Sequence, residues 1–234
     1  AWPRVIPAGD GDVNHQGLDF YDRLVDGLLE SGIDPYVTLY HWDLPQALED
    51  KGGWRSRDTV EAFARYTEIV ADRLGDRVSN WWTINEPWVV AVEGHELGLH
   101  APGHRSVKQA LDVSHHLLLA HARSMDVLHS AGSNRVGIVL NQACHMPRSE
   151  HPADVAATYF ADGRYNRWFL DPLAGHEAAN GSLGEALVGI VLGLFLLLRL
   201  GDIIISGKTM LMFNSGLMSV MFWIEIGVGV VIPT

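Results

Sequence analysis

The stretch VSNWWTINEPWV (78–89) holds the densest local signal in the chain. Its part 78–84 is rich in aromatic and β-branched residues, as a buried strand is, and Asn85, Glu86 and Pro87 follow at once. A glutamate on a short turn after a strand is well placed to act as an acid. Proline disfavours helical dihedral angles at the residue before it, so we expect an extended, fixed backbone at Glu86.

Three side chains near Glu86 suit acid chemistry on a sugar. Trp82 and Trp88 can supply apolar walls, which favour the protonated form of a carboxyl group. Asn85 can donate and accept hydrogen bonds, as recognition of a sugar hydroxyl requires. The competing interpretation is an exposed loop glutamate without a role, which is the better one for an isolated Asn-Glu-Pro. The surrounding sequence therefore has to decide.

Outward from this stretch, helical and strand patterns alternate. Apolar residues at helical spacing predict helices over 19–31, 58–74, 107–131 and 152–160. Runs of β-branched and aromatic residues predict strands over 35–40, 78–84 and 135–140. Such alternation builds βαβ units and a parallel sheet. The sequence thus predicts the α/β class, with about half of a (β/α)8 TIM barrel over 1–177.

Polar residues follow each of the three predicted strands. His41 and Trp42 follow the first strand. Asn85 and Glu86 follow the second, and Asn141 follows the third. Functional residues of (β/α)8 barrels lie at the C-terminal ends of the strands. We therefore expect these five residues to gather at one end of the sheet.

Four motifs occur in a fixed order along the chain. They are AWPRVIPAGDGDVNHQGLDFYDRLVDGLLESGIDPYVTLYHWDLPQALEDKGGW (1–54), WWTINEPW (81–88), HELGLHAPG (95–103) and NRWFLDPL (166–173). Together they resemble glycoside hydrolase family 1, the β-glucosidase family, from Ala1 to about Gly175. The resemblance implies a retaining glycosidase with a TIM barrel. It also implies that the chain begins mid-domain, because the family has Ala-Trp-Pro-Arg at the end of its second strand.

The resemblance implies roles for single residues. Hydrolysis with retention uses two carboxyl groups about 5–5.5 Å apart, one as acid and base and the other as nucleophile. The family places the acid/base at Glu86 and a contact to the sugar 2-hydroxyl at Asn85. His41 and Trp42 match its glycone-binding pair, whose ring N–H groups donate to sugar hydroxyls. Without the family, a core histidine would be the better interpretation of His41.

The sequence matches the family at two further positions and departs from it at others. Trp88 and Asn141 match positions that line the aglycone side in the family. The family's nucleophile lies in a Glu-Asn-Gly motif on its seventh strand, and no Glu-Asn-Gly occurs in this sequence. Its first-strand glutamine and its late tryptophan-rich sugar-binding loop are also missing, and Arg4 is not its second-strand arginine. We therefore expect the acid/base half of a β-glucosidase site, inactive as it stands.

Composition narrows the classes of partner and cofactor. The formal net charge of −11, from 28 acidic and 17 basic residues, argues against nucleic acid. The single cysteine, Cys144, excludes an internal disulfide and a cysteine-rich zinc site. His115, His116 and His121 lack metal-ligand spacing and are expected to be packing or surface residues. We expect no metal and no cofactor, a β-glucoside or oligosaccharide substrate, and a cytoplasmic location for the enzyme part.

Composition changes sharply after about Asn180. The runs 183–200 and 217–232 are long and apolar, and each approaches the length of a membrane-spanning helix. Residues 178–234 are therefore expected to be an unrelated, transmembrane helical tail that associates with membranes. The stretch LLLRLGDIIISGKTMLMFNSGLMSVMFWIEIGVGVVIPT (196–234) is similar to part of the NrfD-type membrane subunit of respiratory oxidoreductases.

Alternatives remain open for the tail and for the whole chain. The two runs could be core helices of a soluble protein, and Glu225 within the second run counts against a simple membrane anchor. The chain could be a respiratory membrane subunit fragment joined to a foreign N-terminal piece. It could also be a membrane-anchored sugar-binding module. The β-glucosidase fragment ranks first, because its motifs cover most of the chain.

Overall fold

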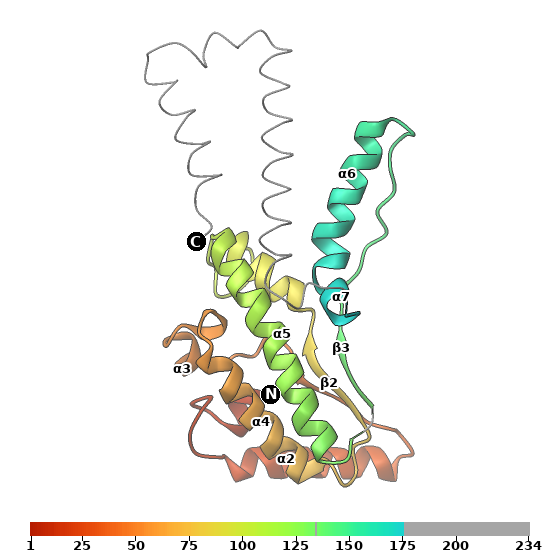
Figure 1. Cartoon of the computed structure of the whole chain (residues 1–234). Coiled ribbons are helices and arrows are strands. Elements are labelled where there is room, and N and C mark those ends of the chain that lie inside the picture. The colour runs from red at the N-terminus through yellow and green to blue at the C-terminus, as the bar shows by residue number, and fades with distance from the viewer. Residues whose placement is uncertain (134, 176–234) are drawn as a thin grey trace. The chain divides into compact units, whose positions relative to one another are not determined.

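The structure of the chain, a computed structural model, describes residues 1–133 and 135–175 (Figure 1). Residues Ala1–Leu170 form one compact unit. Its strands β1 (Tyr36–Tyr40), β2 (Asn80–Asn85) and β3 (Arg135–Val139) form a parallel sheet in the order β1-β2-β3. The α/β class and the parallel sheet predicted from the alternating pattern are confirmed.

The helical segments include all four predicted helices, with α2 beginning four residues earlier than predicted. They are α1 (Trp2–Val5), α2 (His15–Glu30), α3 (Gln46–Glu49), η1 (Gly53–Arg55), α4 (Asp58–Leu74), η2 (Val89–Glu96), α5 (Val107–Ser130), α6 (Pro152–Asp162), η3 (Gly163–Arg167) and α7 (Trp168–Leu173). Helix α4 begins and ends at the predicted residues. Helix α5 begins where Ser106 caps it, since the Ser106 hydroxyl accepts the backbone N–H of Gln109. Six short segments had no counterpart in the prediction, namely α1, α3, η1, η2, η3 and α7.

A buried aromatic cluster anchors the N-terminal segment to the sheet and α4. The Trp2 indole stacks on the Tyr66 ring, with 5.3 Å between ring centroids and 12° between ring planes. Trp2 also packs against Phe63 and Trp54, and Tyr40 of β1 meets Trp54 edge to face. All five side chains are at most 3% exposed. These buried aromatic rings supply much of the apolar area that holds the N-terminal segment, β1 and α4 together.

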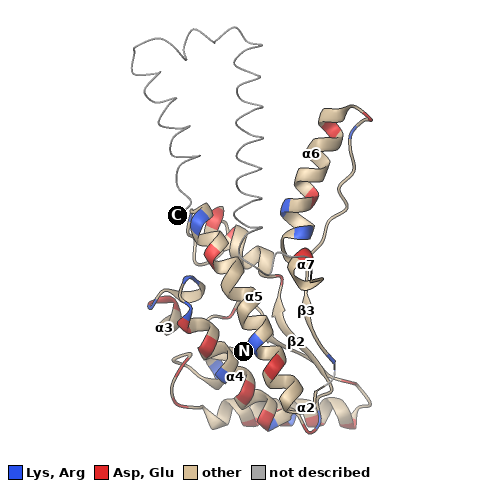
Figure 2. Cartoon of the chain, in the orientation of Figure 1, with Lys and Arg blue, Asp and Glu red and all other residues tan. Residues whose placement is uncertain are grey.

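Helices α4 and α5 pack against each other, and Figure 1 shows both in front of the sheet. Their contact carries a buried hydrogen bond of 3.0 Å between the hydroxyls of Thr67 and Ser124. Charged pairs connect α2 to α4 and the residues just after it. Arg73 reaches Asp19 and Asp22, and Arg77 also reaches Asp22. Figure 2 shows acidic and basic residues on both helices.

The pairing of β2 with β3 is irregular near the end of β2. Trp82 pairs with Gly137, Asn85 pairs with Val139, and the register shifts between these two pairs. Gly137 leaves room for the Trp82 ring, because a Cβ at Gly137 would lie 2.4 Å from a carbon of the indole and the ring would have to shift. The shift lies immediately before Glu86, where the chain leaves the sheet.

Gly17 offers a test of the packing of α2. A Cβ at Gly17 would lie 2.1 Å from the backbone carbonyl oxygen of Arg4, which has little freedom to move. We expect Gly17→Ala to lower the free energy of unfolding by about 1–3 kcal/mol through overpacking. Gly27→Ala in the same helix is the control, because nothing lies within 4 Å of its added Cβ. Urea unfolding should show the control as stable as the parent or slightly more stable. Equal stability of the two variants would contradict the close approach at Gly17.

The predicted membrane spans cannot be compared with this fold. The runs 183–200 and 217–232, and the whole predicted tail 178–234, lie outside the described residues. Within residues 1–133 and 135–175, no helix combines the length and the apolar character needed to cross a membrane. The transmembrane tail, its resemblance to a respiratory subunit and the boundary at 177 stay predictions.

Candidate active site

Two of the predicted site residues have an unusual backbone. Among the described residues, Trp42 (φ 70°) and Glu86 (φ 46°) are the non-glycine residues with positive φ. Residues with side chains of this size rarely adopt the left-handed backbone conformation, and residues that do so concentrate at functional sites. The extended backbone expected at Glu86 is therefore wrong.

The turn from β2 into η2 explains the conformation of Glu86. Its N–H donates to the Val139 carbonyl at 2.8 Å, and its own carbonyl accepts the N–H of Val89 at 3.0 Å. Glu86 thus makes one bond to the edge of β3 and another to the start of a helical segment. Pro87 follows as the first residue of that helical turn, a position that proline favours. These bonds outweigh the statistical preference for extended backbone before proline.

The turn after β1 is held by Asp43, a residue that the sequence prediction missed. One carboxylate oxygen of Asp43 accepts the backbone N–H of His41 at 3.1 Å. The other accepts the backbone N–H of Trp2 at 2.7 Å. Asp43 thus bonds to the backbone of a residue two positions earlier in the chain. Such a side-chain bond to the local backbone fixes the turn. The aspartate in Tyr-His-Trp-Asp was the available signal.

His41, Trp42 and Asn85 form one hydrogen-bonded group. The Trp42 indole N–H donates to the Asn85 carbonyl at 3.0 Å. The Asn85 side-chain amide donates to Nε2 of His41 at 3.3 Å, which makes Nε2 the acceptor and leaves Nδ1 to carry the proton. Glu86 is the next residue in the chain and is half-buried. The structure therefore brings four predicted residues together at the C-terminal ends of β1 and β2.

Trp88 and Asn141 belong to a second group, joined by Tyr165. The Asn141 amide donates to the Tyr165 hydroxyl at 3.0 Å, and the Trp88 ring lies 4.4 Å from the Tyr165 ring. The Trp88 indole N–H donates to the Arg164 carbonyl at 2.9 Å. Tyr165 was missed, although it directly precedes the motif NRWFLDPL. Trp88 and Glu86 are two residues apart in sequence, so the second group adjoins the first.

The loop after η2 contributes a further contact to Trp42. The His100 ring meets the Trp42 indole edge to face, with 5.6 Å between centroids. His100 Nε2 lies 2.9 Å from the Glu93 carboxylate. The Trp42 ring thus has contacts on several sides. It remains accessible to solvent, because Trp42 is 39% exposed. No sequence signal beyond the motif HELGLHAPG pointed to His100.

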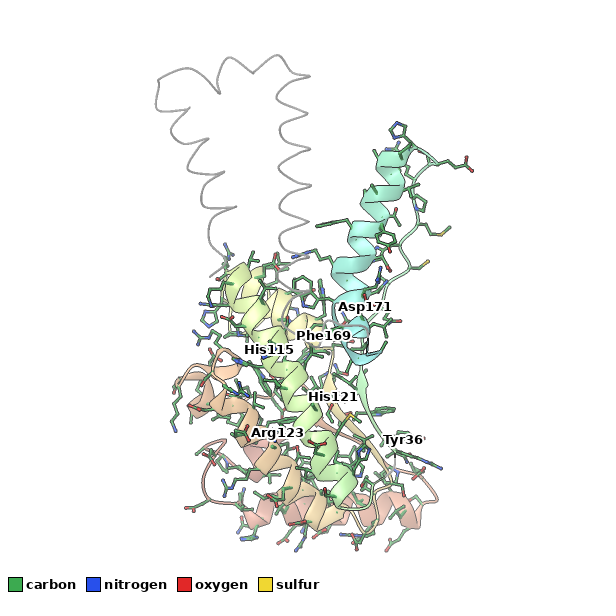
Figure 3. All side chains as sticks on the ribbon, in the orientation of Figure 1. Tyr36, His115, His121, Arg123, Phe169 and Asp171 are labelled. Carbon is green, nitrogen blue, oxygen red and sulfur yellow. The ribbon has the colours of Figure 1, made fainter. Side chains whose placement is uncertain are left out.

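His121 of α5, labelled in Figure 3, bonds to Thr83 of β2. Its Nδ1 lies 2.8 Å from the Thr83 hydroxyl, which in turn donates to the Gly137 carbonyl at 3.2 Å. Because the hydroxyl has one proton, His121 Nδ1–H is the donor in the first bond. Burial lowers the pKa of His121 to about 4. His121 is thus a packing residue, as predicted. Within the described residues, no cluster of His, Cys, Asp and Glu could hold a metal ion.

The buried His121 predicts a pH-dependent stability. Its pKa of about 4 in the folded chain lies below the ordinary value of 6.5. The stability that the neutral ring contributes is therefore complete above pH 6.5 and is lost as the pH falls toward 4, by about 3 kcal/mol in total. Urea unfolding of His121→Gln should lose less stability between pH 7 and pH 4 than the parent. His129→Gln, an exposed residue of the same helix, is the control. An unchanged pH slope in His121→Gln would contradict the buried neutral ring.

Comparison with known proteins finds relatives for most of the chain. The model of the family described as Glycosyl hydrolase family 1 matches residues 1–180. Beta-glucosidase A of Acetivibrio thermocellus is 48% identical over 174 residues, which cover 74% of this chain and 39% of that protein. Beta-glucosidase A of Thermotoga maritima is 48% identical over 176 residues, with the same coverage. The chain thus spans about two fifths of the length of these relatives.

Solved structures of the Thermotoga maritima enzyme share the fold. Its family 1 β-glucosidase in complex with glucoimidazole superimposes with a TM-score of 0.72 at 48% identity. The match covers 73% of this chain and 39% of that one. The same enzyme described without a ligand gives a TM-score of 0.71. The family model, the sequence identities and the shared fold together show that the chain belongs to glycosyl hydrolase family 1.

Proposed function

We propose that residues 1–175 are the acid/base half of a retaining β-glucosidase site. Glu86 is the acid/base, because it is held in a strained left-handed turn at the end of β2. This observation carries the proposal: such a backbone is unfavourable for a glutamate and serves to direct its carboxyl group. In the first step Glu86 protonates the leaving oxygen, and in the second it takes a proton from water.

The hydrogen-bonded group beside Glu86 binds the glycone. The Asn85 amide is positioned for the sugar 2-hydroxyl, a contact that strengthens in the transition state. The Nδ1–H of His41 and the accessible face of the Trp42 indole present a donor and an apolar ring to the sugar. The Thermotoga maritima relative has been solved in complex with deoxynojirimycin and with glucoimidazole, and these complexes support a sugar site.

Trp88, Tyr165 and Asn141 form the aglycone wall in this proposal. Trp88 and Tyr165 present two rings 4.4 Å apart, and Asn141 holds the Tyr165 hydroxyl. Aromatic rings with one polar edge suit an aglycone of mixed polarity. The substrate class is therefore a β-glucoside or short β-linked oligosaccharide, and the proposed chemistry uses carboxyl groups alone.

A chimeric barrel tests the proposal. Residues 1–175 of this chain would replace the matched region of the Thermotoga maritima relative, which supplies the rest of the barrel. We expect the chimera to hydrolyse aryl β-glucosides with retained configuration at the anomeric carbon. A chimera that folds, as judged by circular dichroism and a cooperative unfolding transition, but lacks this activity would contradict the proposal.

A further inference from the structure

Glu96, the last residue of η2, is a mostly buried carboxylate that pairs with Arg164. Its side chain is 14% exposed, and its Oε1 accepts a hydrogen bond of 2.5 Å from the Arg164 guanidinium. Within residues 1–133 and 135–175, its Oε2 is buried and has no hydrogen-bond partner. Burial of a charged group is costly unless the group is paired, so the bond to Arg164 fixes where the Glu96 side chain lies. Neither side chain takes part in the chemistry proposed for Glu86.

Arg164, the second residue of η3, is held at both its backbone and its side chain. Its carbonyl accepts the Trp88 indole N–H at 2.9 Å, and its guanidinium carbon lies 5.7 Å from the centre of the Trp168 ring. A cation over an indole face is attracted to it. The Trp168 indole N–H in turn donates to the hydroxyl of Ser114, a buried residue of α5, at 3.1 Å. Arg164 is thus fixed relative to both η2 and α5.

The residue after Arg164 is Tyr165, whose ring lies against Trp88. Trp88 directly precedes η2, and Tyr165 lies within η3, so the two rings belong to two π-helical segments. Such segments are rare and are often found at functional sites. The ring centroids are 4.4 Å apart, and both side chains are half-buried, so a ligand can reach them. The Glu96–Arg164 bond joins the same two segments and therefore helps to set the distance between the two rings.

Other bonds hold η3 to a different part of the molecule. The Asn166 side chain bonds to the backbone of Ala143, at 2.9 Å to its N–H and 2.8 Å to its carbonyl. The Tyr165 hydroxyl accepts the Asn141 amide. These bonds connect η3 to the segment after β3. The Glu96–Arg164 bond supplies what they do not, a side-chain connection from η3 to the far end of η2.

We infer that Glu96 and Arg164 are positioning residues whose ion pair holds Tyr165 against Trp88, so that the two rings form one continuous surface for a flat aromatic aglycone. The inference deepens the proposed aglycone wall, and for the identity of the ligand it rests on the proposed function. A flat aromatic aglycone gains from contact with both rings. A methyl aglycone is too small to cover them, so it should not sense their spacing.

Fluorine NMR of the full 234-residue chain tests the positioning without any substrate. The chain would be labelled with fluorotyrosine, and the Tyr165 signal is assigned by its loss in Tyr165→Phe. We expect Glu96→Gln to move this signal toward its frequency in the urea-unfolded chain, because the ring loses its fixed place beside the Trp88 indole. Glu61→Gln, which changes the exposed partner of Arg123, should leave the signal in place. The other tyrosine signals show whether either variant disturbs the fold.

Steady-state kinetics of the chimeric barrel tests the consequence for substrates. With phenyl β-glucoside, Glu96→Gln should raise KM about 2–10-fold, the usual contribution of one aromatic contact, and leave kcat unchanged. With methyl β-glucoside, both constants should stay those of the parent chimera. Arg164→Gln should repeat this pattern. The double variant should add nothing to it, because the two residues act as one unit.

An unchanged Tyr165 signal in Glu96→Gln would overturn the inference. Equal rises in KM for phenyl and methyl β-glucoside, or a loss confined to kcat, would overturn it too, because the pair would then act on the whole fold or on catalysis. If the signal moves as expected but a folded chimera has no glucosidase activity, the positioning of Tyr165 is upheld and the proposed function is contradicted.

Discussion

Glu86→Gln in the chimeric barrel is expected to lower kcat/KM for an alkyl β-glucoside by about 10²–10⁴-fold, the usual effect of losing a general acid. An alkoxide is a poor leaving group, so its oxygen has to gain a proton as the glycosidic bond breaks. Glutamine keeps the size of the side chain and the backbone turn but has no acidic proton. Initial rates with methyl β-glucoside would measure the loss.

A matched control separates chemistry from stability. Glu61→Gln makes the same change on the exposed surface of α4, where the Glu61 carboxylate lies 3.7 Å from Arg123. Exposed ion pairs contribute little, so this variant should keep the activity of the chimera. Equal losses in the two variants would mean that the Glu86 substitution acts through folding rather than through proton transfer.

The chain alone is expected to hydrolyse an aryl β-glucoside no faster than the buffer does. Retention requires a second carboxyl group that attacks the anomeric carbon, and the family's Glu-Asn-Gly motif is absent from all 234 residues. Among the described residues, those of β3 and α6 are exposed or half-buried, so water can approach the site from the end of β3. An acid works best where water is excluded around the reacting atoms.

Turnover by the chain alone would contradict this second prediction. The purified chain would then release the phenol from the aryl β-glucoside, with this activity abolished by Glu86→Ala and unaffected by Glu61→Gln. Such a result would show that a second carboxyl group of this chain completes the site. Activity that persists in Glu86→Ala would instead identify a contaminating glycosidase.

Local periodicity was enough to predict the layered part of the fold. Helix 58–74 was predicted at the observed bounds, and the strands were predicted within two residues of theirs. These segments have a strong apolar period, and their tertiary contacts agree with it. The gathering of His41, Trp42, Asn85 and Glu86 followed from their common place after parallel strands.

Features set by contacts between distant segments could not be predicted in this way. The left-handed backbone of Glu86 depends on a bond to Val139 of a strand some fifty residues later, which a local rule for proline cannot include. Tyr165 became part of the site only because Trp88 and Asn141 meet on it. His121 shows the converse case, since its spacing argued against a metal site but did not reveal its bond to Thr83.

The dependence of rate on the leaving group tests the role of Glu86 most directly. Rates of the chimera and of its Glu86→Gln variant would be compared over aryl and alkyl β-glucosides whose leaving groups differ in acidity. We expect nearly equal rates of bond cleavage for dinitrophenyl β-glucoside, because this leaving group needs no proton, and a deficit that grows toward 10²–10⁴-fold for alkyl glucosides. A deficit of the same size for every leaving group would contradict the assignment of Glu86 as the acid.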